Sequence, residues 1–341
     1  MESLAVKYRP KTWDDVVEQN SIKTILGYQL ETGTIKNAYL FVGSAGCGKT
    51  TCGRIFANQI NKGQGTPIEI DAASHNGVDD VRAIIEDSKL QSIDSEYKCF
   101  ILDECHMLST QAWNAMLKLL EEPPEKSIFI MCTTNPERIP TTILSRVQRF
   151  DFQKISTNGI VLRLSAILDM EGVEPQQASD WYPAISYIAK LADGGMRTAI
   201  SLLDKCLSYS TELTIQNVVS ALGVADYTEY FALADALLAS DARVVIETLE
   251  GVKSSGKDSN QFSKGFLGFC MDVCKYCVCR DFKYIRIPNT YEDKLKSTYC
   301  AHEQLFKRYV GLLVHLNSEI RYELDAFTML EATLYLECDN V

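Results

Sequence analysis

This sequence of 341 residues lacks long apolar runs, a signal peptide and an excess of basic residues. No stretch approaches the ~18 uninterrupted apolar residues of a membrane span, and the opening segment MESLAVKYRPKTW lacks the apolar core of a signal peptide. Basic side chains are outnumbered, 34 Lys+Arg against 45 Asp+Glu, for a net charge of -11. These absences argue against membrane, secreted and histone-like proteins. We expect an intracellular, cytoplasmic protein that contacts no membrane and binds any nucleic acid through a local basic face.

Cysteine, in contrast, is abundant, with 12 residues scattered through apolar runs. Without a secretory signal we expect reduced core residues and no disulfides. The segment with Cys270, Cys274, Cys277 and Cys279 raises the alternative of zinc or redox chemistry. Its apolar residues recur at helical spacing and no second C-x-x-C follows, so core packing is favoured and zinc is not expected.

The composition, 46% hydrophobic and 23% charged, is that of a globular protein, and the length suggests two or three domains. Short apolar runs alternate with helical stretches as far as residue 152, which predicts an α/β domain with a parallel sheet. Strands are expected to begin at Ala38, Pro67, Cys99, Ser127 and Arg149. The remainder looks helical. We predict domains at 1–152, 153–223 and 224–341.

The strongest chemical signal is a G-x-x-x-x-G-K-T loop from Gly43 to Thr50, placed between an apolar strand and a helical run. Glycines let the backbone N–H groups surround a phosphate, Lys49 neutralises the β and γ phosphates, and the Thr50 hydroxyl is a ligand for Mg²⁺. A glycine-rich turn that fits by chance is the alternative. The flanking strand and helix make that alternative a weak one, and the loop predicts ATP binding.

Polar residues follow two further apolar strands. Asp103 and Glu104 come directly after Phe100-Ile101-Leu102, where Asp103 can hold Mg²⁺ and Glu104 can polarise a water, unless both belong to a solvated turn. Thr134 can sense the γ phosphate or simply cap its strand. Arg146, at the end of a short helix, is either a solvated charge or an arginine finger that reaches a neighbouring subunit's ATP. Spacing alone leaves those two readings about even.

Taken together, these motifs resemble an AAA+ ATPase, and specifically the clamp-loader branch. Over the first 220 or so residues the sequence resembles the gamma/tau subunit of bacterial DNA polymerase III more closely than the replication factor C small subunits. The matching pieces in chain order are Lys7-Tyr8-Arg9-Pro10, Trp13-Asp14-Asp15-Val16-Val17, the loop from Gly43 to Thr50, Asp103-Glu104-Cys105-His106-Met107-Leu108, Leu119-Leu120-Glu121-Glu122-Pro123-Pro124, Thr133-Thr134-Asn135, Ile143-Leu144-Ser145-Arg146 and Gly194-Gly195-Met196-Arg197.

The resemblance implies an AAA+ domain, a helical lid and an all-helical collar. It implies that Asp103 and Glu104 are the Walker B acids, Thr134 is sensor 1, Arg146 is a finger acting in trans and Arg197 is sensor 2. The remaining ATP-binding positions would be Tyr8, Arg9, Pro10, Val16, Val17, Gly43, Ser44, Ala45, Gly46, Cys47, Gly48, Lys49, Thr50 and Thr51. Such proteins use ATP and Mg²⁺ to open a sliding clamp and place it on primer-template DNA, within a pentameric ring of related subunits.

This sequence differs from the family pattern at three places, which limits what the resemblance implies. The family's four-cysteine zinc module is replaced by Asn61-Lys62-Gly63-Gln64-Gly65-Thr66, and the family's Ser-Arg-Cys reads Ser145-Arg146-Val147. We also expect only the ATPase and collar parts here, without the long tail of tau. DNA contacts are harder to predict. The candidates are His75 and Asn76, beside Ala73 and Ser74, and Ser109, Thr110 and Gln111, although each can equally be a turn or a helix cap.

Two alternative functions are compatible with these motifs. One is a different AAA+ machine, a homo-oligomeric motor that remodels DNA, although no winged-helix pattern follows Gly223. The other is a structural clamp-loader subunit that does not hydrolyse ATP. The intact Gly48, Lys49, Thr50 and Glu104 argue against it, because a non-catalytic subunit has no chemical need for them.

Overall fold

The structure is a computed structural model that describes residues 2–173, 181–210, 212–222, 227–287, 291–319 and 326–338. The chain divides into two compact units, Met1–Glu212 and Leu213–Val341. The predicted domain boundary after residue 152 lies inside the first unit. The boundary predicted after residue 223 falls outside the described residues.

The first unit contains a five-stranded sheet in the order β2-β3-β4-β1-β5, and every neighbouring pair is parallel. The five predicted strands are thereby confirmed, each with a start within one residue of the expected position. Ile and Phe recur in these short segments, because both faces of a parallel sheet are covered. The strands are β1 (Ala38–Val42), β2 (Ile68–Asp71), β3 (Lys98–Asp103), β4 (Ser127–Thr133) and β5 (Gln148–Asp151).

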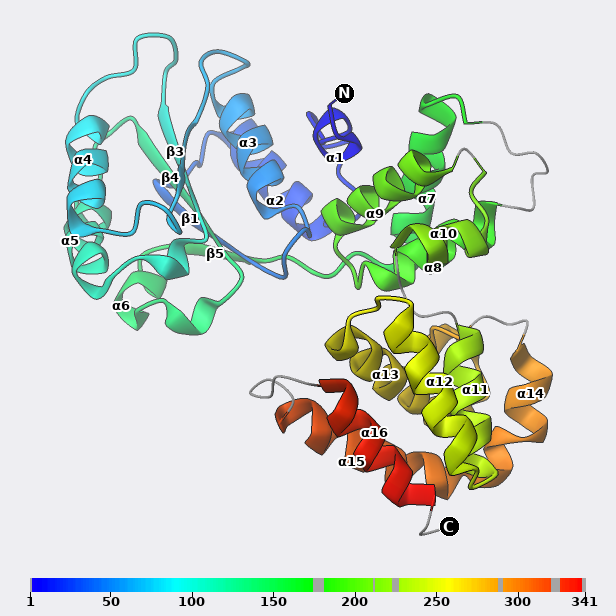
Figure 1. The fold of residues 1–341 in the computed structure, drawn as a ribbon. Helices are drawn as coiled ribbons and strands as arrows, with labels where there is room; N and C mark the ends of the chain where they lie inside the picture. Colours follow the sequence, from blue (N-terminus) through cyan, green and yellow to red (C-terminus); the bar gives the residue numbers. More distant parts are fainter. Residues whose placement is uncertain are drawn as a thin grey trace. The chain divides into compact units, whose positions relative to one another are not determined.

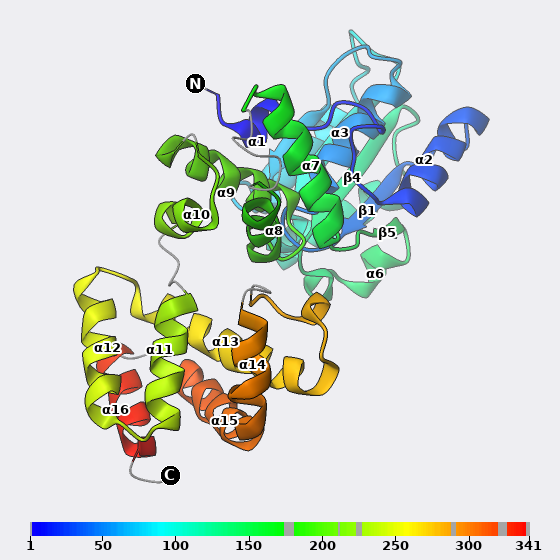
Figure 2. The ribbon, with the colours of Figure 1, turned by 90° about the vertical axis from the view of Figure 1, so that its right-hand side faces the viewer.

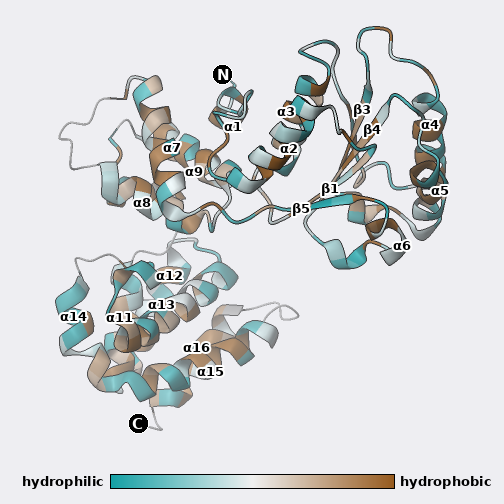
Figure 3. Cartoon of the chain, turned by 180° about the vertical axis from the view of Figure 1, so that it is seen from behind, coloured by the Kyte–Doolittle hydropathy of each residue, from teal (hydrophilic) through white to brown (hydrophobic). Residues whose placement is uncertain are grey.

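Helices cover both faces of this sheet (Figure 1). On one face lie α4 (Val78–Ser88) and α5 (Thr110–Glu121), and on the other lie α2 (Asn20–Thr32) and α3 (Lys49–Ile60). Successive strand residues alternate between two buried clusters: Leu40 packs with Trp113 of α5, whereas Tyr39 packs with Phe56 of α3. The predicted α/β class is confirmed, and Figure 3 shows apolar colouring along β3 and β4 between the helices.

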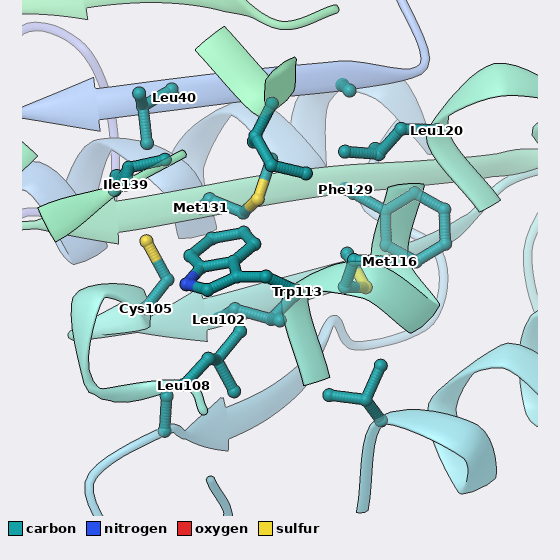
Figure 4. Close-up of a cluster of buried hydrophobic side chains, with 14 of the residues drawn as sticks. Leu40, Leu102, Cys105, Leu108, Trp113, Met116, Leu120, Phe129, Met131 and Ile139 are labelled. Atoms are coloured by element: carbon teal, nitrogen blue, oxygen red, sulfur yellow. The ribbon is translucent and has the colours of Figure 1, made fainter. Parts of the chain in front are cut away.

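Trp113 is the largest side chain in the cluster beneath α5. It is 2% exposed and lies beside Met131, Cys105 and Leu102 (Figure 4). The α5 helix ends at Glu121, shortly before Pro123 and Pro124, which cannot continue a helix. Its packing fixes the position of the segment that follows β3, where the predicted catalytic acids lie.

The rest of the first unit is helical. A short helix α1 (Leu4–Lys7) packs against α9, where the backbone N of Leu4 donates to the Asp204 carboxylate at 3.1 Å. Helices α7, α8 and α9 lie side by side (Figure 2). The bounds of these elements are α6 (Thr141–Leu144), α7 (Thr157–Met170), α8 (Trp181–Leu191) and α9 (Met196–Tyr209).

In the described residues of the second unit, the regular elements are all helices, as predicted. The longest is α13, in which Cys270 is fully buried and Cys274 and Cys277 are half-buried against neighbouring helices. Burial raises the pKa of the Cys270 thiol, so it remains a neutral core residue. The helices are α10 (Ile215–Leu222), α11 (Tyr227–Leu238), α12 (Ala242–Ser254), α13 (Ser259–Cys279), α14 (Glu292–Ser297), α15 (Glu303–Glu319) and α16 (Ala326–Cys338).

Candidate nucleotide site

The glycine-rich loop connects β1 to α3 at the carboxyl edge of the sheet. Gly46 and Gly48 have φ angles of 75° and 104°, in the left-handed region that glycine adopts without strain. Lys49 opens α3 and is 6% exposed, and its Nζ donates to the carbonyls of Gly43 at 2.8 Å and Ser44 at 3.0 Å. The loop therefore holds the lysine charge at the N-terminus of a helix, the place where a phosphate is best stabilised.

A hydroxyl and a carboxylate meet beside this loop. Thr50 Oγ1 donates to Asp103 Oδ2 at 2.9 Å, which joins the first turn of α3 to the end of β3. Hard oxygen ligands of this kind suit Mg²⁺, which keeps several waters and uses one or two protein oxygens together with substrate phosphates. The donor set fits the predicted ion, and Thr50 and Asp103 are the residues that would hold it.

Glu104 follows Asp103 in a left-handed backbone conformation, with a φ of 45°. Its Oε2 accepts hydrogen bonds from the backbone N of Thr134 at 3.2 Å and from Thr134 Oγ1 at 2.9 Å. The structure thus brings together the predicted water-polarising acid and the predicted γ-phosphate sensor. His106 Nδ1 lies 3.2 Å from the same oxygen. Its hydrogen-bond partner is Thr133 Oγ1, 3.1 Å from Nδ1.

A cavity of about 350 Å³ opens over these groups, within the size range of small-molecule sites. Gly43, Ser44, Thr134 and Arg146 do not line it. All other predicted ATP-binding and catalytic residues do, including two early segments that are remote from the loop in sequence. They are Tyr8, Arg9, Pro10, Val16, Val17, Ala45, Gly46, Cys47, Gly48, Lys49, Thr50, Thr51, Asp103, Glu104 and Arg197.

Two arginines that line the cavity were missed by the sequence analysis. Arg54, on α3, pairs with Glu69, and Arg163, on α7, donates from Nη2 to the Tyr8 carbonyl at 3.2 Å. Desolvation, followed by the charges of Arg54 and Arg197, lowers the pKa of Arg9. Repelling guanidinium groups around one cavity favour an anionic ligand. Arg54 could have been found from the sequence, because it lies on the helix that follows the phosphate loop. No local pattern in the sequence places Arg163 at the cavity.

The start of α9 touches the phosphate loop directly. The backbone N of Met196 donates to the Gly46 carbonyl at 3.0 Å. A Cβ at Gly195 would lie 3.1 Å from the Ala45 carbonyl oxygen, closer than an ordinary van der Waals contact. A side chain at position 195 would therefore push these two backbones apart by a few tenths of an ångström. The close approach of the two backbones places Arg197 at the cavity wall.

Arg146 does not belong to this cavity within one chain. Its guanidinium pairs with Glu121 at 2.6 Å and donates to the Thr142 carbonyl at 2.7 Å, and the residue is exposed. Both readings of Arg146 therefore remain open, since an exposed arginine can be a solvated charge or can serve a neighbour.

The predicted DNA-contacting residues form one exposed neighbourhood. The backbone N of Ser109 donates to the Asn76 carbonyl at 3.1 Å, which joins the two predicted segments. Ser109 caps α5 by accepting from the backbone N of Ala112, so its side chain has the structural role that the sequence analysis left open. His75, Thr110 and Gln111 are exposed beside the N-terminus of α5.

Among the described residues, no helix is long and apolar enough to cross a membrane.

The fold and this site define a class: the first unit is a P-loop ATPase domain of the AAA+ type. Solved structures agree on the fold. The RuvB Holliday junction branch migration motor of Thermotoga maritima is 19% identical with a TM-score of 0.53, covering 74% of this chain and 86% of that one. At this level of identity the likeness concerns the fold alone.

Sequence comparison gives the particular relatives. DNA polymerase III subunit tau of Bacillus subtilis is 38% identical, over 79% of this chain and 51% of that protein. The gamma/tau subunit of Mycoplasma genitalium is 30% identical, over 95% of this chain and 56% of that protein. The family model described as DNA polymerase III, delta subunit, matches residues 66–156. The resemblance is confirmed: the chain is a relative of the bacterial DNA polymerase III gamma/tau subunits and spans about half of their length.

Proposed function

We propose that this protein is an ATP-hydrolysing subunit of a sliding-clamp loader that acts in DNA replication. The observation that supports it most is the convergence of the phosphate loop, the Thr50–Asp103 pair and the Glu104–Thr134 pair at one sheet edge. The relationship to the gamma/tau subunits supports the replication role. ATP and Mg²⁺ are the ligands for which this arrangement is suited.

The residues divide the chemistry between them. Lys49 exchanges its bonds to the Gly43 and Ser44 carbonyls for phosphate oxygens, which needs only a side-chain rotation. Thr50 and Asp103 would hold the magnesium ion, which would supply positive charge beside the phosphates. Glu104 orients a water and accepts its proton, and Thr134 contacts the γ phosphate. Arg197 approaches the phosphates from the cavity wall.

The wider assembly is part of the same proposal. Residues 1–152 form the AAA+ domain, 153–223 the lid and 224–341 the collar that joins subunits. Arg146 completes a neighbour's ATP site in a pentameric ring, and the partners are related subunits, a sliding clamp and primer-template DNA. The exposed segments around His75, Asn76 and Thr110 face the DNA phosphates in this proposal.

Nucleotide binding and turnover test the site. Lys49→Ala is expected to abolish ATP binding, while Glu104→Gln binds ATP and loses hydrolysis; Lys126→Ala, at an exposed lysine, is the control that keeps both. Fluorescent ATP analogues measure affinity, and phosphate release measures turnover. Binding undiminished in Lys49→Ala would refute the site.

A separate measurement tests the biological role. Native mass spectrometry of the tagged chain, purified from its own cells with ATP and Mg²⁺, is expected to show five related subunits with a ring clamp attached. A homohexamer without a clamp would instead favour the alternative, a DNA-remodelling motor, while leaving the ATPase site unaffected.

A further inference from the structure

Arg163 joins helix α7 to the segment near the start of the chain that lines the nucleotide cavity. Its Nη2 donates to the backbone carbonyl of Tyr8 at 3.2 Å, and its own side chain lines the same cavity. The donor carries a positive charge, so this hydrogen bond is of the stronger kind. It fixes the Tyr8 backbone to a helix that follows it by 155 positions in the chain.

Asp15 gives Arg163 a second attachment to the same segment. Its carboxylate accepts hydrogen bonds from the backbone N of Thr12 at 3.1 Å and from Thr12 Oγ1 at 2.9 Å. The Thr12 hydroxyl first, and then backbone donors and the charge of Arg163, lower the pKa of Asp15, so the carboxyl is ionised at neutral pH. The guanidinium thus attracts the segment at two places, Tyr8 and Asp15.

This segment offers a nucleotide something different from what the phosphate loop offers. The loop supplies backbone N–H groups and the charge of Lys49, which suit phosphates. The segment supplies apolar surface to the cavity, from Pro10, the buried Val16 and Val17. In a nucleotide only the base has flat apolar faces, so the base is the part that this surface fits.

We infer that Arg163 is a positioning residue for the base: by holding the Tyr8 carbonyl, it keeps the segment from Tyr8 to Pro10 at the cavity wall, where it contacts the base. The inference rests on the proposed ATP binding. The competing role for an arginine in this cavity is a direct contact with a phosphate. A phosphate contact would favour any polyphosphate, whereas the positioning role favours only a ligand that has a base.

ATP and inorganic tripolyphosphate separate the two roles, because both carry three phosphates and only ATP carries a base. Arg163→Met keeps an apolar stem and removes the charge and the donors. We expect it to raise the Kd for ATP about 10-fold, as for one hydrogen bond to a charged group, and to leave the Kd for tripolyphosphate within about twofold. Competition with a fluorescent ATP analogue measures both affinities.

Arg82→Met is the matched control, because Arg82 is exposed on α4 and does not line the cavity. It should change neither Kd. Arg163→Lys keeps one charged donor, and it replaces the methionine variant if that variant fails to fold, as thermal melting shows. It should raise the Kd for ATP by less, about threefold, again without an effect on tripolyphosphate.

Tryptic cleavage supplies a readout that does not depend on affinity. Lys7 and Lys11 are exposed on either side of the segment from Tyr8 to Pro10. Cleavage after these two lysines should be faster in Arg163→Met than in the wild type. ATP should slow cleavage of the wild type, and tripolyphosphate should not.

Equal rises in the two Kd values for Arg163→Met would overturn the inference in favour of a phosphate contact. An unchanged Kd for ATP would overturn it as well. Lys49→Ala, which should bind neither ligand, separates the inference from the proposed function. Should the wild type bind neither ligand, the proposed function fails. Should Lys49→Ala lose both ligands while Arg163→Met binds ATP as the wild type does, only the role of Arg163 fails.

Discussion

Substitution of Gly195 by Ala tests the contact between the phosphate loop and α9. The backbone there, with φ -94° and ψ 104°, is open to alanine, so any cost arises from contacts. The added Cβ would lie 3.1 Å from the Ala45 carbonyl oxygen, 3.2 Å from Thr198 Oγ1 and 3.3 Å from the Ala192 carbonyl oxygen. Two of these three atoms belong to the backbone and cannot rotate away. Overpacking of this kind costs about 1–3 kcal/mol.

The strain is relieved when α9 moves away from the loop, which lengthens the 3.0 Å hydrogen bond from Met196 N to the Gly46 carbonyl. That movement also withdraws Arg197 from the cavity. We therefore expect two effects of Gly195→Ala. The melting temperature falls by several degrees, at about 2–4 °C per kcal/mol for a domain of this size. The Kd for ATP rises, by about fivefold for each kcal/mol of lost interaction.

Gly27→Ala is the matched control. Gly27 lies within α2, and a Cβ there would meet no atom within 4 Å. The same substitution should stabilise the protein by about 0.4–1 kcal/mol, because alanine restricts the unfolded chain, and should leave the Kd for ATP unchanged. Differential scanning fluorimetry and nucleotide titration measure both quantities. If Gly195→Ala melts and binds ATP like Gly27→Ala, the close approach of α9 to the loop is refuted.

Two further predictions concern the core. Trp113→Ala should lower the free energy of unfolding by about 3–5 kcal/mol, measured by urea denaturation. Trp113→Phe should cost less, because it keeps an aromatic ring and removes an indole N–H that is buried without a hydrogen-bond partner; an equal loss for both would contradict the packing in Figure 4. Burial raises the pKa of Cys52 and of Cys99 to about 12, so at pH 8 both thiols are protonated. Iodoacetamide should label them in urea and not in the native protein, as measured by peptide mass spectrometry, with the exposed Cys279 as the thiol that reacts in both.

Local patterns in the sequence were sufficient to predict the strands and the chemistry at their ends. The apolar run at β3 is followed at once by Asp103 and Glu104, and in a parallel sheet the carboxyl ends of strands share one edge. The meeting of Thr50 with Asp103, and of Glu104 with Thr134, follows from that topology. The roles assigned to these residues remain predictions until nucleotide binding is measured.

Other parts of the site depend on contacts that no local pattern encodes. Arg163 reaches the Tyr8 carbonyl across 155 positions of the chain, and Gly195 lies where a Cβ would approach the Ala45 carbonyl oxygen to 3.1 Å. Arg163 belongs to none of the motifs, and the motif that contains Gly195 does not indicate which atoms Gly195 approaches. Their importance depends on how α7 and α9 pack against the loop, and periodicity predicts that a helix exists without predicting what it touches.

These long-range contacts suggest how nucleotide could couple the parts of the first unit. The segment from Tyr8 to Val17, the phosphate loop and the start of α9 line the same cavity. A ligand there would bind all three at once, and its binding free energy would stabilise only the arrangement that keeps them together. In the absence of ligand, Arg9 lies in the repulsive field of Arg54 and Arg197. An anionic nucleotide would remove that repulsion. The protein should therefore melt at a higher temperature with Mg²⁺-ATP, and the increase should shrink in Gly195→Ala, which separates α9 from the loop.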